Sequence, residues 1–570
     1  MNDVIRIALC QANLPVGDLD GNVERVGQLI ADARAGGAEL VVLPELALTG
    51  YPPEDLLLKT SFVTDAAQAL QALAEDVHDI VAIVGLPSQS AEERLRNSAA
   101  VLAGGGGVAT YHKHFLPNYA VFDEQRYFAP GDHAVVLDLG GVRVGITICE
   151  DIWEPGGPAE WATMDGGAGL LVNLSASPYH RAKGRERERL FAERCTDYRC
   201  FLAFCNAVGG QDELVFDGHS LVIDPTGAVL ARGHQFEEDL LVVDLDLATL
   251  PGSRRAGATT GTERVRIVTC DRSGPIRPAL DPPAPPALLD PEAEVYRALT
   301  LGTADYLDKN GFRGAVLGLS GGIDSALSLA IAVDAIGPEA VTAVSMPSRY
   351  TAEANRDDAT VLARRLGVTL LETPIDTLVR GYAETLARPF ADTEPDIAEE
   401  NLQARIRGNL LMALSNKFGW LVLSTGNKSE MSVGYTTLYG DMAGGFAILK
   451  DVLKTWVYRL SVWRNREREI IPQRILDKPP TAELRANQLD TDSLPPYDTL
   501  DAILEAYIEQ DLSPTEIEAL GFDRATVCSV VQLVDRAEYK RRQAPPGVRI
   551  STRAFGKDRR LPITNRYRPR

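Results

Sequence analysis

Short apolar runs alternate with amphipathic stretches along the first 270 residues of the chain. Each apolar run has the length of a β-strand, and residues 22–34 have the apolar spacing of a helix. The predicted strands are residues 4–9, 39–43, 80–85, 98–102, 142–149, 169–173, 201–206 and 240–245. Many strands that alternate with helices predict an α/β domain.

The same alternation continues beyond residue 290 with longer helical stretches. The predicted helices are residues 291–309, 326–336, 351–366 and 399–418, and the predicted strands are 315–317, 340–346, 369–373 and 420–424. Apolar strands separated by helices favour a doubly wound parallel sheet of the Rossmann type, in which ligands bind beyond the carboxyl ends of the strands. Residues 318–325, 345–348 and 424–426 occupy three such ends.

Between the two patterns lies a segment rich in proline, residues 271–290. Such a composition favours an extended linker over a helix or strand. We therefore expect an N-terminal domain at residues 1–270 and a C-terminal domain at residues 291–570.

Composition and charge narrow the possible functions. The formal net charge of −21 over 570 residues argues against a nucleic-acid-binding protein, although residues 540–570 hold eleven Lys or Arg and one acid. This basic segment fits a small anionic ligand or an ordinary solvated tail.

The sequence has no apolar run of about 20 residues and no N-terminal signal segment, so we expect a cytosolic protein without a membrane span. The seven cysteines do not form a disulfide pattern, and we expect Cys195, Cys200 and Cys205 to be buried thiols.

Histidine is confined to the first half of the chain, since all seven lie at or before His234. The second half must therefore perform any chemistry without an imidazole. Phosphoryl and adenylyl transfer can proceed in this way, because positioning, cations and metal ions supply most of the catalysis.

The loop Gly-Leu-Ser-Gly-Gly-Ile-Asp-Ser at residues 318–325 joins a predicted strand to a predicted helix. Its glycines allow positive φ, and exposed N–H groups at a helix N-terminus bind anions. The loop lacks the lysine of a Walker A motif and carries Asp324 instead. A carboxylate beside a phosphate requires a cation between them, which indicates bound Mg²⁺. A simple tight turn is the alternative interpretation.

Three polar residues of the first half each lie at the end of a strand-like run: Glu45, Lys113 and Cys149. The run before Lys113 is residues 109–111. A cysteine can act as a nucleophile in acyl transfer when a base takes its proton and a cation stabilises the oxyanion. Taken singly, a cysteine that ends an apolar strand is more often a packed thiol, and spacing alone does not establish that the three residues converge.

The motifs around these residues resemble the nitrilase superfamily. They are Leu-Pro-Glu at 43–45, Tyr-His-Lys at 111–113 and Ile-Cys-Glu-Asp-Ile-Trp at 148–153, and the likeness covers about residues 4–245. The resemblance implies a four-layer αββα sandwich with Glu45 as general base, Lys113 as oxyanion residue and Cys149 as nucleophile. It also implies Glu124 as a second glutamate of the site. In the glutaminase branch, Tyr119, Ser177 and Lys183 would contact glutamine, with Ser175 as the alternative to Ser177.

The second half resembles the ATP pyrophosphatase superfamily at residues 318–325 and the NAD synthetase family over about residues 290–570. The matching segments are 318–325, 424–430, 439–441, 478–484, 492–497 and 538–542. The resemblance implies that ATP binds to Gly318, Leu319, Ser320, Gly321, Gly322, Ile323, Asp324, Ser325, Thr425, Lys454 and Thr481. It implies that Mg²⁺ binds to Asp324 and Glu430, and that deamido-NAD binds to Asn401, Glu430 and Lys540. Leu438 and Gly445 depart from the ammonia-only members, which have a lysine and an acid there, so substrate contacts at these two positions are not carried over.

Both halves together resemble the glutamine-dependent branch of the NAD synthetase family. This implies that ammonia from glutamine reaches, through an internal tunnel, a nicotinate carboxylate adenylated by ATP. A second hypothesis keeps both chemistries with a different acid as the acceptor. A non-catalytic glutamine or nucleotide sensor is disfavoured, because Glu45, Lys113, Cys149, Asp324 and Glu430 are all present. We also expect a homo-oligomer that forms through the C-terminal domains.

Overall fold

The computed structural model describes residues 4–89, 94–250, 262–271, 278–280, 284–481, 483–485 and 488–567. The chain divides into two compact units, one of Met1–Gln211 with Val215–Leu289 and the other of Asp212–Leu214 with Asp290–Arg570. The predicted linker is residues 271–290, of which residues 272–277 and 281–283 lie outside the described residues.

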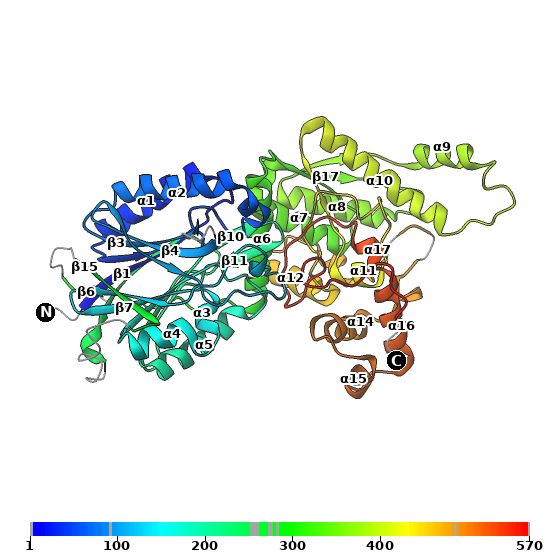
Figure 1. Ribbon diagram of the computed structural model, residues 1–570. Coiled ribbons are helices and arrows are strands. Elements are labelled where there is room, and N and C mark those ends of the chain that lie inside the picture. Colours follow the sequence, from blue (N-terminus) through cyan, green and yellow to red (C-terminus); the bar gives the residue numbers. More distant parts are fainter. Residues whose placement is uncertain are drawn as a thin grey trace. The chain divides into compact units, whose positions relative to one another are not determined.

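Two sheets form the centre of the first unit (Figure 1). The six-stranded sheet has the order β14-β1-β2-β3-β4-β5, and the seven-stranded sheet has the order β13-β12-β9-β8-β7-β6-β15. The first sheet consists of β1 (Val4–Gln11), β2 (Leu40–Val42), β3 (Val81–Gln89), β4 (Leu95–Ala103), β5 (Gly106–His112) and β14 (Asp239–Asp246). The second consists of β6 (Ala134–Leu139), β7 (Val142–Ile148), β8 (Leu170–Ser175), β9 (Phe201–Asn206), β12 (Leu221–Ile223), β13 (Val229–Arg232) and β15 (Val265–Cys270).

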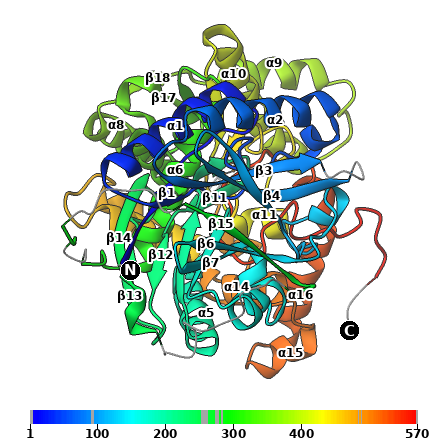
Figure 2. The same ribbon diagram turned by 60° about the vertical axis from the view of Figure 1, so that its left-hand side comes forward.

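Helices cover the outer faces of these sheets. On the first sheet lie α1 (Leu19–Ala35) and α2 (Thr60–Glu75), side by side (Figure 2). On the second sheet lie α4 (Gly157–Glu160) and α5 (Lys183–Tyr198), close to the short α3 (Glu150–Trp153). A further hairpin, β10 (Val208–Gln211) and β11 (Leu214–Asp217), stands apart from both sheets.

The apolar residues explain the four layers. Alternate side chains of each strand face opposite sides of its sheet. Ile7, Val42, Val144 and Val172 belong to one buried cluster that fills the space between the two sheets. The opposite faces supply two further clusters, one packed on α1 and α2 and the other on α4 and α5. The predicted αββα sandwich is therefore confirmed.

The second unit is built on a five-stranded parallel sheet with the order β18-β17-β16-β19-β20. Its strands are β16 (Ala315–Gly318), β17 (Val341–Ser345), β18 (Thr369–Glu372), β19 (Leu421–Ser424) and β20 (Phe446–Ala447). The helices are α6 (Pro291–Lys309), α7 (Ile323–Ile336), α8 (Glu353–Leu366), α9 (Asp376–Leu386), α10 (Ile397–Phe418), α11 (Lys428–Val433), α12 (Lys454–Arg464) and α13 (Gln473–Asp477). Helices α6, α7 and α12 pack on one another, and α10 packs on β16 and β19. The predicted doubly wound parallel sheet is confirmed.

The C-terminal part of the second unit is helical. It contains α14 (Tyr497–Leu504), α15 (Pro514–Ala519), α16 (Arg524–Arg536) and α17 (Glu538–Arg541), and α14, α15 and α16 share an apolar core that includes Leu500, Ile517 and Val530. Each predicted strand and helix of both halves is present, with ends that differ by a few residues. Among the described residues, no helix combines the length and the apolar character that a membrane crossing requires.

Candidate active sites

Three predicted residues of the first unit meet around one buried ammonium group. The Nζ atom of Lys113 donates to Oε1 of Glu45 at 2.8 Å and to Oε1 of Glu124 at 2.7 Å. The side chains of Lys113 and Glu45 are fully buried, and that of Glu124 is 7% exposed. Burial disfavours the charge on Lys113, but the two carboxylates outweigh it and raise the pKa of Lys113 well above its usual value. The lysine is therefore a permanent cation.

The Glu45 carboxylate is held from two further directions. Nδ2 of Asn97 donates to Oε1 at 2.7 Å, and the backbone N–H of Ala176 donates to Oε2 at 3.1 Å. Four strand ends thus converge, because Glu45 follows β2, Lys113 follows β5, Asn97 lies on β4 and Ala176 follows β8. This fixed orientation suits a group that must accept a proton along one direction.

Cys149 stands directly after β7 and before α3, with φ of +43°. A positive φ is rare for a residue with a side chain and is typical of a strained functional turn. The thiol is buried. Burial, followed by the Glu45 carboxylate, raises the pKa of Cys149 well above its usual value, against the opposing effect of Lys113. Cys149 is therefore a neutral thiol at rest, and a base would have to take its proton before it could act as a nucleophile.

Burial also affects Glu124, whose pKa rises to about 7 despite the charge of Lys113. Tyr51 donates to the same carboxylate oxygen, Oε1, at 3.3 Å. Glu124 can therefore hold or release a proton near neutral pH while Glu45 accepts its full set of hydrogen bonds.

The residues that were predicted to contact the substrate glutamine lie in different environments. Tyr119 is 56% exposed and donates to Oε1 of Glu150 at 2.8 Å. Ser177 is buried, and its N–H donates to Oδ1 of Asn206 at 2.9 Å. The Nζ atom of Lys183 lies 3.8 Å from the ring centroid of Trp153. The hydroxyl of the alternative residue, Ser175, donates to Asn173 at 2.8 Å.

The loop at residues 318–325 joins β16 to α7 in the second unit, as the sequence predicts. Gly321 has φ of +78°, and a Cβ atom there would lie 2.4 Å from the carbonyl oxygen of Asn355. Only glycine fits this approach of two backbone segments. Inside the loop, the Ser320 hydroxyl oxygen accepts from Gly322 N–H at 3.2 Å, and the Ser325 hydroxyl donates to the Gly322 carbonyl at 3.0 Å.

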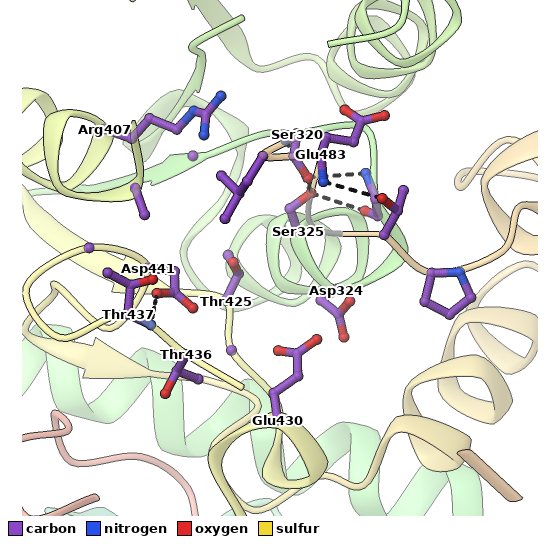
Figure 3. A pocket seen from close by; sticks show the side chains of 18 of the residues that line it. Ser320, Asp324, Ser325, Arg407, Thr425, Glu430, Thr436, Thr437, Asp441 and Glu483 are labelled. Atoms are coloured by element: carbon purple, nitrogen blue, oxygen red, sulfur yellow. Dashed lines mark hydrogen bonds between the residues drawn. The ribbon is translucent and has the colours of Figure 1, made fainter. Parts of the chain in front are cut away.

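The loop borders a cavity of about 390 Å³ (Figure 3). Except for Gly321, which backs onto Asn355, all the residues that the resemblance assigns to ATP and deamido-NAD line this cavity. They are Gly318, Leu319, Ser320, Gly322, Ile323, Asp324, Ser325, Thr425, Lys454, Thr481, Asn401, Glu430 and Lys540. The carboxyl ends of β16, β17 and β19 supply part of the wall, as expected for a parallel sheet.

Asp324 and Glu430, which both line the cavity, lie close to one lysine, Lys454. Nζ of Lys454 lies 2.5 Å from Oδ2 of Asp324 and 3.5 Å from Oε1 of Glu430. Nδ2 of Asn427 donates to Oδ1 of Asp324 at 2.8 Å. Burial and the neighbouring Asp324 carboxylate raise the pKa of Glu430 to about 8. Glu430 therefore keeps its proton near neutral pH unless further positive charge lies beside it.

Both acids can be ionised together only with more positive charge nearby, and a magnesium ion would supply it. Among the described residues there is no group of three or more His, Cys, Asp or Glu side chains placed to hold a metal. Two carboxylates are nevertheless a usual protein contribution to Mg²⁺ bound with a nucleotide, since phosphate oxygens and water supply the other ligands.

Two residues that were predicted to bind the dinucleotide have polar partners within the protein. Oδ1 of Asn401 accepts from the Thr437 hydroxyl at 2.7 Å, and Nζ of Lys540 donates to the carbonyls of Gly434 and Thr436 at 2.7 Å each. Neither Leu438 nor Gly445 is among the described residues that line the cavity. A Cβ atom on Gly445 would lie 2.4 Å from Cδ1 of Leu421.

Sequence reasoning missed several polar residues at both sites. Asn97 binds Glu45, Asn427 binds Asp324, and Arg407 is a largely buried arginine that lines the cavity and donates to the Met346 carbonyl at 3.1 Å. Asn427 lies within the matching segment 424–430, but its hydrogen bond to Asp324 was not predicted. Nothing in the local sequence marks Asn97 or Arg407. The three cysteines predicted to be buried, Cys195, Cys200 and Cys205, are buried free thiols.

Comparison with known proteins bears on both halves. The carbon-nitrogen hydrolase family matches residues 6–255, and the NAD synthase family matches residues 295–544. The glutamine-dependent NAD(+) synthetases of Thermotoga maritima and Acinetobacter baylyi are 49% and 46% identical, and each alignment covers 99% of this chain and 99% of the relative. A solved glutamine-dependent NAD+ synthetase from Acinetobacter baumannii, in complex with adenosine diphosphate, is 42% identical, with a TM-score of 0.75 and 99% of both chains covered. The resemblances of both halves are therefore confirmed, and the chain belongs to the glutamine-dependent NAD(+) synthetase family.

Proposed function

We propose that this chain converts deamido-NAD to NAD, with glutamine as the nitrogen donor and ATP as the activating nucleotide. The observation that carries the proposal is the buried Lys113 ammonium between Glu45 and Glu124, next to a neutral thiol at a strained strand end. A nucleophile, a base and a fixed cation are the groups that amide hydrolysis requires.

In the first reaction, Sγ of Cys149 attacks the carboxamide carbon of glutamine and its proton passes to Glu45. Lys113 stabilises the oxyanion that forms. The proton then moves to the leaving nitrogen, ammonia departs and a thioester remains. Water attacks the thioester, Glu45 accepts a proton from it, and glutamate leaves with the thiol restored.

Glutamine would lie between Tyr119, Glu124, Ser177 and Lys183. Since the Ser175 hydroxyl already donates to Asn173, Ser177 is the better candidate of the two serines. Lys183 stacks on Trp153 and offers a cation to the α-carboxylate of the amino acid.

In the second reaction, the loop at 318–325 and Thr425 hold ATP. A nicotinate carboxylate oxygen attacks the α-phosphorus and pyrophosphate leaves, while Lys454 and Thr481 bind its oxygens. Ammonia then attacks the carboxyl carbon of the mixed anhydride, and AMP leaves. Asp324 and Glu430 would hold Mg²⁺, which when bound supplies positive charge opposite the phosphates.

Asn401, Glu430 and Lys540 would contact deamido-NAD. We further propose a glutaminase domain at residues 1–270, a linker at 271–290 and a synthetase domain at 291–570, with ammonia passed internally between the two sites. Assembly into a homo-oligomer through the synthetase domains and a cytosolic location stay predictions.

The test measures NAD formed from deamido-NAD, ATP and Mg²⁺ by the intact chain and by Cys149→Ala. Each protein receives either glutamine or ammonium at raised pH. We expect Cys149→Ala to lose turnover with glutamine and to keep turnover with ammonium. If the intact chain makes no NAD from either nitrogen source, the acceptor is a different carboxylate. If Cys149→Ala still uses glutamine, the nucleophile is wrong.

A further inference from the structure

Helix α5 buries an arginine that the reactions above do not use. Arg187 is 0% exposed, and NH1 donates to both carboxylate oxygens of Asp217, at 2.7 and 2.9 Å. Asp217 ends β11 and is also 0% exposed. A buried ion pair is weak evidence for stability, because the desolvation of both charges offsets their attraction. The position of the pair is more informative than its strength.

The second arm of the guanidinium reaches Ser177. NH2 of Arg187 donates to the Ser177 carbonyl at 2.9 Å and to its Oγ at 3.3 Å. The Phe204 ring lies under the guanidinium, with Cζ 5.9 Å from the ring centroid. A planar fork that bonds two separate groups is a geometry that arginine provides and lysine cannot.

Lys183 and Arg187 lie four residues apart on α5, so they share one face of the helix. This face therefore carries both the cation proposed for the α-carboxylate of glutamine and the arginine that binds Ser177. The segment around Ser177 is fixed at two more points, since Ser177 N–H donates to Asn206 and Tyr179 N–H donates to the Val215 carbonyl at 2.7 Å.

We propose that Arg187 and Asp217 are positioning residues that orient Ser177 toward glutamine, an inference that rests on the proposed function. Because Oγ of Ser177 accepts from Arg187, its own proton points away from the guanidinium. The hydroxyl is then ready to donate to an oxygen of the amino-acid substrate. Asp217 sets the plane of the guanidinium and compensates its charge, and neither residue touches the reacting atoms.

The first experiment measures KM and kcat for glutamine with Arg187→Lys in the full chain. Lysine keeps the charge opposite Asp217 but lacks the second nitrogen, NH2, which reaches Ser177. We expect KM for glutamine to rise about tenfold, the effect of one lost hydrogen bond to a charged group, with kcat changed by less than about threefold. Turnover with ammonium should not change. Arg189→Lys is the matched control, because Arg189 lies on the same helix with its side chain 74% exposed.

The second experiment removes turnover and measures binding. In a Cys149→Ala background, calorimetry should show glutamine binding about tenfold weaker when Arg187→Lys is added. The double change Arg187→Met with Asp217→Leu leaves no unpaired buried charge, so it tests the same loss if Arg187→Lys folds poorly. It should weaken glutamine binding by a similar factor.

An unchanged KM and an unchanged dissociation constant would overturn the proposal. A fall in kcat with no change in KM or binding would do the same, because it would indicate a role in the chemical step. These outcomes differ from failure of the proposed function, in which the unaltered chain itself does not use glutamine.

Discussion

The carboxylates that pair with Lys113 are almost completely buried, whereas those that pair with Lys454 line a cavity of about 390 Å³. The side chains of Glu45 and Glu124 are 0% and 7% exposed, and those of Asp324 and Glu430 are 18% and 17% exposed. Both sites contain one lysine between two acids. Asn97 and Ala176 complete the hydrogen bonds of Glu45 at the first site, while burial, followed by the Asp324 carboxylate, raises the pKa of Glu430 to about 8 at the second.

The difference fits the proposed function. In the proposed amide hydrolysis the nucleophile, the base and the cation would all belong to the chain, so they can be assembled before the substrate arrives. In the proposed adenylyl transfer the phosphates and a metal ion would come with the substrates, so the site would need room for them. Substitutions at the first site should therefore affect one nitrogen source, and substitutions at the second should affect both.

Lys113→Met is expected to have the largest effect. It removes the cation from a site where two carboxylates depend on it, so NAD formation with glutamine should fall at least about 1,000-fold. The first unit should also lose about 3–5 kcal/mol of stability, because a buried pair loses one partner. Rates with glutamine and with ammonium, together with urea unfolding, check this. Lys59→Met, at an exposed position, is the control, and a glutamine rate within tenfold of the unaltered rate would contradict the assignment.

Asp324→Asn should lower NAD formation about 100-fold with glutamine and with ammonium alike, because it removes the charge that pairs with Lys454 and that would hold Mg²⁺. Steady-state rates over a range of Mg²⁺ concentration measure the effect, and the half-saturating Mg²⁺ concentration should rise. A loss confined to the glutamine reaction would show that Asp324 serves the other site.

Asn427→Ala should have a smaller effect on the same reaction. Asn427 donates to Asp324 and also caps α11 by accepting from Glu430 N–H at 3.0 Å. We expect about a tenfold loss of turnover from the freed Asp324 carboxylate and about 1 kcal/mol of stability from the lost cap. Asn427→Ser retains a capping oxygen. It should restore the stability measured by thermal unfolding but not the turnover.

Glu188→Gln tests an ion pair of the first unit that has no assigned task in either reaction, and should have the smallest effect. Burial favours the neutral acid, but hydrogen bonds from His219 at 2.8 Å and Arg232 at 2.7 Å outweigh it and lower the pKa of Glu188 to about 2. Because the folded pKa is below the unfolded value, the stabilisation is complete above pH ~4.5 and is lost as pH falls toward 2. Glu188→Gln should cost about 1 kcal/mol at neutral pH, flatten the loss of stability between pH ~4.5 and ~2 and leave both reactions unchanged.

Urea unfolding of the unaltered chain and of Glu188→Gln over this pH range measures the difference. If Glu188→Gln shows the same acid dependence as the unaltered chain, Glu188 does not titrate as described. If it alters the rate with either nitrogen source, the pair is not a neutral reference for the two sites.

The strands and helices could be predicted from the sequence, because periodicity is a local pattern. The candidate site residues came from motifs that resemble known families, and the structure brings Glu45, Lys113 and Glu124 together. The partners of these residues come from far away in the chain: Asn97 is 52 residues from Glu45, and Asn427 is 103 residues from Asp324. No local signal gives such a pairing. The contact of Arg187 with Asp217 was missed for the same reason, since the two residues are 30 positions apart.

The neutral thiol of Cys149 has a consequence for the survival of the protein in an oxidising cell. Peroxides oxidise thiolates far more readily than thiols, and a cysteine that is kept permanently ionised is a standing target for sulfenic acid formation. Burial and the Glu45 carboxylate keep the sulfur of Cys149 protonated. We therefore expect Cys149 to react slowly with peroxide in the resting protein.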